Sequence, residues 1–516
     1  MYENTHKFAF MKKRASFRAP AMAAILFLLS GLSGALAQTI PAEVVNLFNK
    51  ADAEISGFYS HSGPIARDVR ANDFFRPRIA VPDCEEAGRL KDMVRISGGE
   101  PVDMPSEGCS VMDLRLSAVD WDGAAMPDGW VRAENEYSIL VFKTVATWNM
   151  PFVGESELSR LLDNGLRRLP FGITSFEELT RKARTYRRAV ELMDGIFTID
   201  THSDLPDDYE KGRSVGTRTL SQSGVPRMDE GRLDSQILIS FLWQGPTDDT
   251  SSRLAVERNL ARIAEIKKDV AKYPHLCGIA TTPAEARALN AEGKKAFLVA
   301  LENGYGIGND LGNIKRMRDL GVVYITLCHF SDNAICNTSS NRGGDPTKGL
   351  TEYGKQVVKE MNRQGIMIDL SHPSAQTFWD CVNLSEAPVI CSHSGAKAIY
   401  GHDRGLDDRQ LKALAGNGGV IQVYTVPDFL CRSSATIDDF MSHFNHCVEV
   451  AGPEHVGIGS DFDGGGGVIG CNGVNDLVNV TVKMLEHGYT PDQIKGFWGG
   501  NFLRVMEEVQ SKACRD

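Results

Sequence analysis

Residues 366–394 read IMIDLSHPSAQTFWDCVNLSEAPVICSHS, and this stretch contains the pattern that decides the fold. Two short apolar runs, at 366–370 and 388–391, are each followed by a serine and a histidine, and a longer stretch separates them. Continuous apolar runs are typical of strands buried on both faces, and their alternation with helices indicates a parallel sheet. The stretch therefore predicts two parallel strands, each with a histidine at its carboxyl end.

The same unit recurs through the C-terminal part of the chain. Eight such runs alternate with longer stretches of helical character: 196–200, 237–243, 296–301, 322–327, 366–370, 388–391, 420–424 and 456–459. Helices are expected at 313–320, at 407–414 and from Thr490, where Thr490-Pro491-Asp492-Gln493 has the form of a helix start. Eight units over roughly 320 residues favour an α/β fold with a closed (β/α)8 barrel, assigned to 191–510. A doubly wound open sheet is the alternative, and the count of eight favours the barrel.

The first 37 residues predict a signal peptide. Basic residues between positions 12 and 18 precede an apolar run at 21–36, and Ala35-Leu36-Ala37 has the small-x-small form that signal peptidase needs. A membrane anchor is the alternative, but the run is short for a span and contains serines and glycines, which favours cleavage. We therefore expect an exported protein, periplasmic or extracellular, without a stable membrane span after cleavage.

Residues 38–190 are assigned to an N-terminal extension with a lead-in helix. Residues 38–170 are rich in Pro, Gly, Asp and Arg, and they contain only scattered strand-like pieces such as 137–145. Little regular structure is expected there. Ser175-Phe176-Glu177-Glu178 has the form of a capping box and predicts a helix that ends at about residue 193.

Composition excludes some classes of function. The formal net charge of −11 argues against nucleic acid as a partner, because proteins that bind nucleic acid usually present a basic face. The 11 cysteines all follow the leader, and export permits disulfides. Cys84 and Cys109 are candidates to pair, whereas Cys328 and Cys391 fall inside strand-like runs and are expected to be buried thiols. The odd count leaves at least one thiol free or paired between chains, and a homodimer is compatible with the sequence.

Histidines and acidic residues gather at the ends of the predicted strands. His202 and Asp204 follow the first run; Glu302, His329, His372 and His393 follow the third to sixth; and Asp461 follows the eighth. The carboxyl ends of barrel strands converge on one mouth, so these residues are expected to be neighbours. Neutral imidazoles with carboxylates form a ligand set for divalent metals, zinc first. A single histidine at a strand end is more often structural, but this repetition favours a metal site.

The spacing suggests how two ions could be divided between these residues. His202 and Asp204 lie on the same side of an extended segment, and the two oxygens of Glu302 could bridge two ions. One zinc ion would then be held by His202, Asp204 and Glu302, and the other by Glu302, His372 and His393. Such a pair, about 3.5–4 Å apart, can share a hydroxide that attacks a peptide carbonyl.

Each of the other residues near the strand ends is compatible with more than one role. Asp461 could accept a proton from the hydroxide and pass it to the leaving amine, and His329 could donate to the oxyanion, bind metal or be a core residue. Arg404 could grip a substrate carboxylate bidentately or cap the following helix. The run Gly464–Gly467 allows close approach of the backbone to substrate or simple loop flexibility. Asp200 and Asp369 could orient ligating imidazoles.

At these residues the chain resembles the membrane dipeptidase (renal dipeptidase) family, peptidase family M19 of the amidohydrolase superfamily, over about residues 190–510. The motifs that match are His202-Ser203-Asp204-Leu205-Pro206, the Glu302 segment, Tyr324-Ile325-Thr326-Leu327-Cys328-His329, Asp369-Leu370-Ser371-His372, Ser392-His393-Ser394 and Gly459-Ser460-Asp461-Phe462-Asp463-Gly464. The resemblance implies a (β/α)8 barrel, a pair of zinc ions bridged by Glu302, and a dipeptide substrate. It implies that His202 and Asp204 bind one zinc and that His372 and His393 bind the other. It also implies that His329 and Arg404 bind substrate, with Arg404 on its C-terminal carboxylate, and that Asp461 is the acid/base.

The chain departs from the family pattern around the pocket. Glu302-Asn303-Gly304 stands where the family commonly has Glu-Gly-Gly, Arg404-Gly405 where it has Arg-Asn, and residues 330–337 replace a loop that contains tryptophan. These changes bear on substrate preference more than on the chemistry. Two other hypotheses therefore remain: the same barrel and metals acting on a lactone, cyclic amide or N-acyl amino acid, and a binding or scaffold protein.

Overall fold

The computed structural model describes five strands between residues 77 and 151, and residues 176–514 apart from 218–220, 341–344, 346 and 433–434. The chain divides into two compact units, of which the second contains residues 184–516. The predicted leader, residues 1–37, and the side chains of Cys84 and Cys109 lie outside the described residues. Within the described part of the chain, no helix has the length and apolar character needed to cross a bilayer.

The N-terminal part of the chain contains a five-stranded sheet. Its strands are β1 (Pro77–Val81), β2 (Glu100–Asp103), β3 (Cys109–Asp120), β4 (Trp130–Glu134) and β5 (Ile139–Pro151), in the order β2-β1-β3-β5-β4. Strands β3 and β5 pair antiparallel, and β1 pairs parallel with β2. The sequence predicted little regular structure in this region, with scattered strand-like pieces such as 137–145; that piece overlaps β5, and the pairing of five strands into one sheet was not predicted.

The C-terminal unit is built on eight parallel strands whose order in the sheet follows their order in the chain. They are β6 (Ile199–Ser203), β7 (Ser235–Phe241), β9 (Lys295–Glu302), β10 (Val322–Thr326), β11 (Met367–Asp369), β12 (Ile390–Ala396), β14 (Val420–Val423) and β15 (Val456–Ile458). Each corresponds to one of the eight predicted runs. Two further short strands were not predicted: β8 (Cys277–Ile279) pairs with β9, and β13 (Gly405–Leu406) pairs with β12.

The first and last strands approach each other and nearly close the sheet. Ser203 and Phe462 form a parallel bridge, and the Asp204 amide donates to the Phe462 carbonyl at 2.9 Å. The Asp461 amide donates in turn to the His202 carbonyl at 3.2 Å. A doubly wound sheet reverses its strand order and keeps two open edges, so the sequential order and the joined edges confirm the (β/α)8 barrel.

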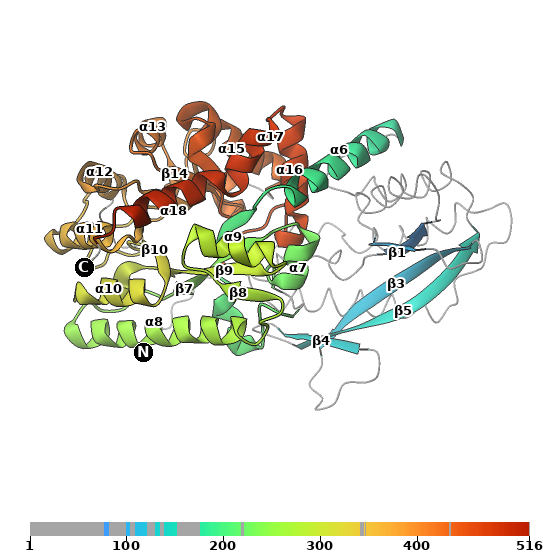
Figure 1. The fold of residues 1–516 in the computed structure, drawn as a ribbon, viewed down its shortest axis with the longest axis horizontal. Helices are drawn as coiled ribbons and strands as arrows, with labels where there is room; N and C mark the ends of the chain where they lie inside the picture. The colour runs from blue at the N-terminus through green and yellow to red at the C-terminus, as the bar shows by residue number, and fades with distance from the viewer. Residues whose placement is uncertain are drawn as a thin grey trace, which may run out of the picture. The chain divides into compact units, whose positions relative to one another are not determined.

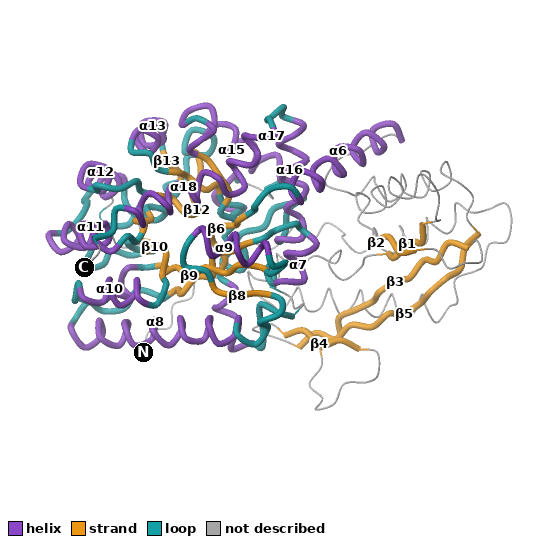
Figure 2. Tube along the Cα trace, viewed as in Figure 1, coloured by secondary structure: helices purple, strands orange, loops and turns teal. Residues whose placement is uncertain are grey.

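Helices surround the strands of this unit (Figures 1 and 2). They are α7 (Val225–Glu230), α8 (Asp249–Val270), α9 (Pro283–Ala291), α10 (Gly312–Asp319), α11 (Glu352–Gln364), α12 (Ala375–Leu384), α13 (Asp408–Gly416), α14 (Pro427–Leu430), α15 (Ile437–Ala451), α16 (Leu477–Glu486), α17 (Pro491–Lys495) and α18 (Asn501–Ser511). Helix α6 (Phe176–Asp194) precedes the first of the barrel strands. The predicted starts are confirmed, because Asp407 and Thr490 each form a capping box with the glutamine three residues later. Helix α6 occupies the place of the predicted lead-in helix.

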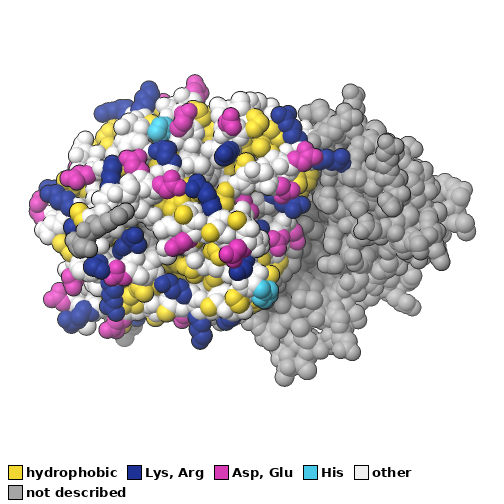
Figure 3. Space-filling model, in the orientation of Figure 1, with side chains coloured by type: hydrophobic (Ala, Val, Ile, Leu, Met, Phe, Trp, Pro, Cys, Tyr) yellow, Lys and Arg dark blue, Asp and Glu magenta, His cyan; other side chains and the backbone are white. Residues whose placement is uncertain are grey.

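Apart from Lys295 at the start of β9, the residues of the eight barrel strands are buried, which explains their apolar sequences. Every residue of β7 is buried, and Ile237 and Ile239 pack in one cluster with Leu298 of β9 and with Phe502 and Met506 of α18. Basic and acidic side chains are distributed over the outer face of this unit that Figure 3 shows. Cys328 and Cys391 are buried and outside any disulfide, as expected.

Candidate metal centre

The residues predicted to bind metal come together at the carboxyl ends of the barrel strands. His202 lies in β6 with Asp204 just after it, Glu302 ends β9, and His393 lies in β12. His372 and Asp461 each come three residues after the end of a strand, β11 and β15. All six are buried, while His329, three residues after β10, is half-buried.

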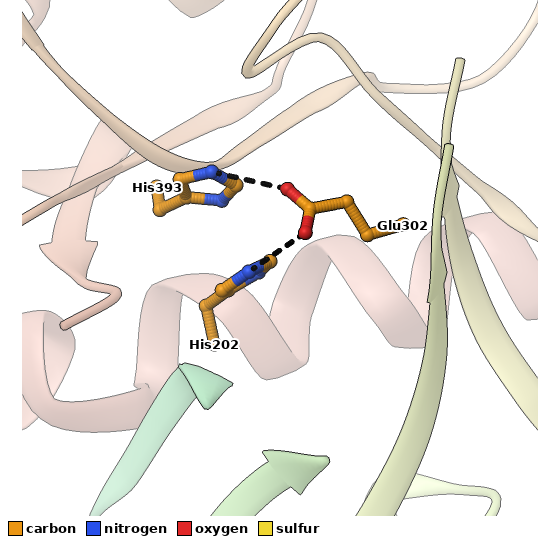
Figure 4. A group of neighbouring side chains, drawn as sticks. All are labelled: His202, Glu302 and His393. Carbon is orange, nitrogen blue, oxygen red and sulfur yellow. Dashed lines mark ion pairs between the residues drawn. The ribbon is translucent and has the colours of Figure 1, made fainter. Parts of the chain in front are cut away.

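Glu302 lies at the middle of the group. Its Oε1 is 2.9 Å from Nε2 of His372 and 3.5 Å from Nε2 of His393, and its Oε2 is 3.7 Å from Nε2 of His202. Figure 4 shows His202 and His393 directed at the two different oxygens of this carboxylate. The two ring nitrogens Nε2 of His372 and His393 are only 3.0 Å apart.

Three overlapping groups in the described part of the chain have ligand atoms within 4.8 Å of one another: His202, Glu302 and His393; Glu302, His329 and His372; and His202, Asp204 and Asp461. Together they contain the five predicted ligands, with His329 and Asp461 added. Glu302 and His202 each belong to two of these groups, so the three groups form one continuous cluster of candidate ligands.

Neighbouring hydroxyls fix the proton of His202 on the nitrogen that faces away from the group. Nδ1 of His202 lies 2.9 Å from the Tyr324 hydroxyl, and that hydroxyl donates to the Thr201 carbonyl at 2.9 Å. Because the phenolic proton is already used, Nδ1 must be the donor to Tyr324. The lone pair is therefore on Nε2, which is buried and has no hydrogen-bond partner.

A serine hydroxyl fixes the position of the proton on the His393 ring in the same way. The Ser392 hydroxyl donates to Oδ2 of Asp369 at 2.6 Å and lies 2.9 Å from Nδ1 of His393. The ring therefore donates from Nδ1 and keeps its lone pair on Nε2, toward Glu302. Asp369 thus acts on His393 through Ser392 and not by direct contact.

Asp200 does not have the role that the sequence suggested. Its carboxylate accepts from the Ser460 amide at 2.8 Å, the Ser460 hydroxyl at 2.6 Å and the Gln236 side chain at 2.9 Å. These bonds join β6 to the segment after β15 that carries Asp461. The acceptor for the His202 ring is Tyr324, so Asp200 holds the two edges of the barrel together and does not orient the imidazole.

At His372, His393 and Glu302, burial and charge favour the protonation states that a metal needs. At His202, burial would lower the pKa, but the carboxylates of Glu302 and Asp461 outweigh it and raise that pKa. Burial lowers the pKa of His372 well below its usual value, and the Arg404 cation lowers it further; burial and His202 do the same to His393. Burial raises the pKa of Glu302, but His202 and His329 outweigh it and hold that pKa well below its usual value. Neutral imidazoles and an ionised carboxylate are the forms that bind divalent metal.

The pKa values of two other carboxyls are shifted upward. Burial, reinforced by Glu302, raises the pKa of Asp204 well above its usual value. Burial likewise raises the pKa of Asp461 to about 6, although His202 opposes the shift. Among the described residues, the ion pairs of Asp204, Glu302 and Asp461 are with histidines alone. Buried carboxylates without a compensating cation are costly, so the donor set fits bound metal.

The loop after β15 is strained where it meets the group. Asp461 and Asp463 have φ of 63° and 66°, which is uncommon outside glycine. Asp463 is anchored by the Ser221 hydroxyl at 2.6 Å and the Gln222 amide at 2.8 Å. A Cβ on Gly464 would collide with Oδ2 of Asp204 and lie 2.5 Å from Oδ1 of Asp461. Within the run Gly464–Gly467, Gly464 therefore allows the backbone to lie close to two carboxylates.

Arg404 is turned into the protein and is only 3% exposed. Its Nη2 lies 3.2 Å from Nε2 of His372 and donates to the His393 carbonyl at 3.2 Å, while its Nε and Nη1 are buried without a hydrogen-bond partner. It lines a cavity of about 90 Å³ with Ser339 and Ser394 among others. The alternative of a surface helix cap is wrong, because Asp407 caps the following helix.

The sequence places Tyr324, Ser392 and Asp463 in motifs that match the family, but it assigned them no role of their own. Tyr324 lies inside a run that reads as buried strand, and nothing in the sequence shows that its hydroxyl reaches a ring 122 positions away. Ser392 precedes a candidate histidine, and that adjacency was the one available signal. Asp463 follows Asp461 by two positions, and its hydrogen bonds to Ser221 and Gln222, which the sequence does not reveal, give it a different role.

Comparison with known proteins gives a consistent result. The profile of the family described as "Membrane dipeptidase (Peptidase family M19)" matches residues 186–515. An uncharacterized dipeptidase of Schizosaccharomyces pombe is 33% identical over 361 residues, which cover 65% of this chain and 85% of the relative.

The chain is also similar to a number of solved structures. The probable dipeptidase PvdM from Pseudomonas aeruginosa shares 26% identity with a TM-score of 0.60, covering 64% of this chain and 99% of its own. A metallo peptidase from Rhodobacter sphaeroides, liganded with a phosphinate mimic of the dipeptide L-Ala-D-Ala, shares 25% identity with a TM-score of 0.55, covering 61% and 99%.

Proposed function

Because the chain belongs to the membrane dipeptidase family, peptidase family M19, we propose that it hydrolyses dipeptides with two zinc ions held at the mouth of the barrel. The observation that supports this most strongly is the convergence of imidazole nitrogens and carboxylate oxygens from β6, β9, β11, β12 and the segment after β15 within a few ångströms. We infer that His202, Asp204 and Glu302 hold one ion and that Glu302, His372 and His393 hold the other. When bound, zinc acidifies water and polarises the peptide carbonyl.

Asp461 is suited to move the proton that hydrolysis requires. Its Oδ1 lies 4.0 Å from Nε2 of His202, and its raised pKa of about 6 allows it to exchange a proton near neutral pH. In our proposal it accepts a proton from the attacking water and delivers it to the nitrogen of the leaving residue, so that the C–N bond breaks to give an amine and a carboxylic acid. The strained backbone at Asp461 fixes this carboxyl beside the group.

His329 is positioned to bind the oxygen of the scissile carbonyl, and Arg404 to bind the C-terminal carboxylate of the substrate. His329 lies within the group formed with Glu302 and His372, where a ring N–H can donate to the oxyanion that develops on the substrate carbonyl. Arg404 has two nitrogens without a partner beside His372, and in the described part of the chain no ion pair neutralises it. A buried guanidinium in this state calls for an anion, and the free carboxylate of a dipeptide supplies one.

The leader, residues 1–37, supports export of the mature chain, and we propose a periplasmic or extracellular location. Cleavage of the leader would be seen as a mature N-terminus near residue 38 when the protein is recovered from the periplasm or medium of an expression host. Recovery of the uncleaved chain in a membrane fraction would contradict this part of the proposal.

The experiment that tests the function is a dipeptide panel with zinc-loaded, full-length protein. The panel contains L-Xaa–L-Xaa and L-Xaa–D-Xaa dipeptides, with N-acetylated and amidated versions as controls. Hydrolysis of free dipeptides, and its loss when the C-terminal carboxylate is amidated, is the expected result. Failure to hydrolyse any free dipeptide while two zinc ions are bound would overturn the proposal.

A further inference from the structure

The loop after β7 carries a large apolar side chain that is exposed beside the candidate metal centre. Trp243 is 73% exposed, although its ring packs edge-on against Phe241 at 5.0 Å and against His329 at 5.5 Å between ring centroids. Sequence analysis placed Trp243 at the end of a strand, but β7 ends at Phe241. Trp243 therefore stands in a loop at the mouth of the barrel.

The loop is held in place from both sides of the tryptophan. Asn303, next to Glu302, donates from Nδ2 to the Leu242 carbonyl at 3.0 Å and to Oε1 of Gln244 at 3.2 Å. Asn303 has φ of 74°, and its Oδ1 accepts from Asn333 at 3.1 Å. The residue after the central carboxylate thus fixes the position of Trp243 relative to the reacting groups.

Aromatic rings continue from Trp243 along one side of the site. The His329 ring lies 4.3 Å from Phe330 and 4.4 Å from His372, and Phe330 lies 6.5 Å from Phe429. The chain of contacts ends at Arg404, whose guanidinium carbon is 5.8 Å from the centre of the Phe429 ring. Trp243 and Arg404 are thus the two ends of this row, with His329 and Phe330 between them.

We propose that Trp243 is a specificity residue that contacts the side chain of the substrate's N-terminal residue and favours large apolar side chains there. The inference rests on the proposed function, in which Arg404 holds the C-terminal carboxylate. The scissile carbonyl then lies beside His329 and Glu302, in the middle of the row. The N-terminal residue extends from that point away from Arg404, and Trp243 is the aromatic side chain at that end.

The physical basis is the burial of apolar surface that the free protein leaves in water. A tryptophan ring offers a wide, rigid apolar face with little rotamer freedom to lose. A leucine or phenylalanine side chain lying against it would remove apolar area from both partners, whereas glycine offers none. Asn303 reduces the cost further, because the loop needs no ordering when substrate binds.

The test is a comparison of kcat/KM for Leu-Ala and Phe-Ala with Gly-Ala, using the zinc-loaded full chain and its Trp243→Ala variant. We expect the ratio of Leu-Ala to Gly-Ala to fall about tenfold in the variant, a typical value for lost contact with an apolar side chain. The ratio of Ala-Leu to Ala-Gly should stay within about twofold, because the C-terminal side chain is at the other end of the row. Trp243→Phe should retain most of the preference.

Two further variants test whether a change in the ratio of Leu-Ala to Gly-Ala is specific to Trp243 and its loop. Asn303→Gly, which suits the positive φ, removes both bonds to the loop and should lower the same ratio in the same direction. Leu254→Ala, another exposed apolar side chain on α8, should leave the ratio as in the parent.

The outcomes separate the inference from the function on which it rests. Parent protein that hydrolyses none of these dipeptides overturns the proposed function. Parent protein that hydrolyses them, with the same Leu-Ala to Gly-Ala ratio in Trp243→Ala, overturns the inference and leaves the function intact. A change that follows the C-terminal side chain overturns the assignment of Trp243 to the N-terminal residue.

Discussion

Replacing Gly464 with alanine tests how closely the candidate carboxylates are packed. The added Cβ would lie 2.5 Å from Oδ1 of Asp461, about 0.9 Å inside the 3.4 Å at which ordinary contact begins, and closer still to Oδ2 of Asp204. Gly464 does not have a positive φ, so alanine brings no backbone penalty of that kind. The clash can be relieved only if one or both carboxylates, or the loop that carries Asp461, move by about 1 Å.

Such a displacement should affect binding and turnover together. Misplacement of a reacting group by about 1 Å costs about 100-fold in rate, and disturbed metal ligands cost about 10- to 100-fold in affinity. We therefore expect kcat/KM on Ala-Ala to fall about 100-fold in Gly464→Ala and the protein to lose zinc more readily to a chelator. Metal content by mass spectrometry of the metal ions and steady-state kinetics measure the two effects.

The matched control is Gly416→Ala. A Cβ on Gly416, at the end of α13, would meet no atom within 4 Å, and its φ is not positive. This variant should keep both the zinc content and kcat/KM of the parent. If Gly464→Ala matched Gly416→Ala in both measurements, the close approach of Gly464 to Asp204 and Asp461 would have no functional meaning and the reasoning would fail.

The remaining predictions concern single groups of the site. Asp461→Asn should keep both zinc ions but lose at least about 100-fold in kcat, since it cannot exchange the proton; equal kcat in variant and parent would refute the acid/base role. Tyr324→Phe removes the acceptor of the His202 ring and should weaken zinc binding about 10-fold in a chelator titration, with unchanged affinity as the contrary result. Arg404→Ala should raise KM on Ala-Ala far more than it lowers kcat. If the parent protein hydrolysed amidated dipeptides as well as free ones, Arg404 would not be needed to bind the C-terminal carboxylate. In metal-free protein, the Asp461 pKa of about 6 lies above the unfolded value of about 3.9, so this group's contribution to stability is present below pH 4 and is lost as the pH rises through 6. Denaturant unfolding of metal-free Asp461→Asn should therefore show a smaller loss of stability between pH 4 and 7 than the parent, by about 2 kcal/mol.

The barrel could be predicted because its strands are buried on both faces and read as uninterrupted apolar runs. The predicted boundaries fail where a strand enters the site. Strand β12 continues to Ala396 through Ser392, His393 and Ser394, and β6 continues to Ser203, although the predicted runs end at 391 and 200. Hydrophobicity marks the packed part of a strand and stops where polar functional groups begin.

The ligand residues could be predicted because strand ends converge in a barrel, whatever the details of packing. The groups that fix their orientation could not. The proton on Nδ1 of His202 depends on the Tyr324 hydroxyl, and the anchoring of Trp243 depends on Asn303, 60 residues later in the chain. The first relation joins β10 to β6, which are separated in the sheet by β9 and β7, and the second joins the ends of the neighbouring strands β7 and β9. No local sequence pattern encodes either relation. The N-terminal sheet was missed for another reason: its strands lie in a stretch rich in turn-forming residues.

The most direct measurement is anomalous X-ray diffraction at the zinc edge from crystals of the zinc-loaded protein. We expect two anomalous peaks at the mouth of the barrel, one touching His202 and Asp204, the other touching His372 and His393, with Glu302 in contact with both. Peaks elsewhere in the chain, or an ordered site without zinc in protein that actively hydrolyses dipeptides, would contradict it.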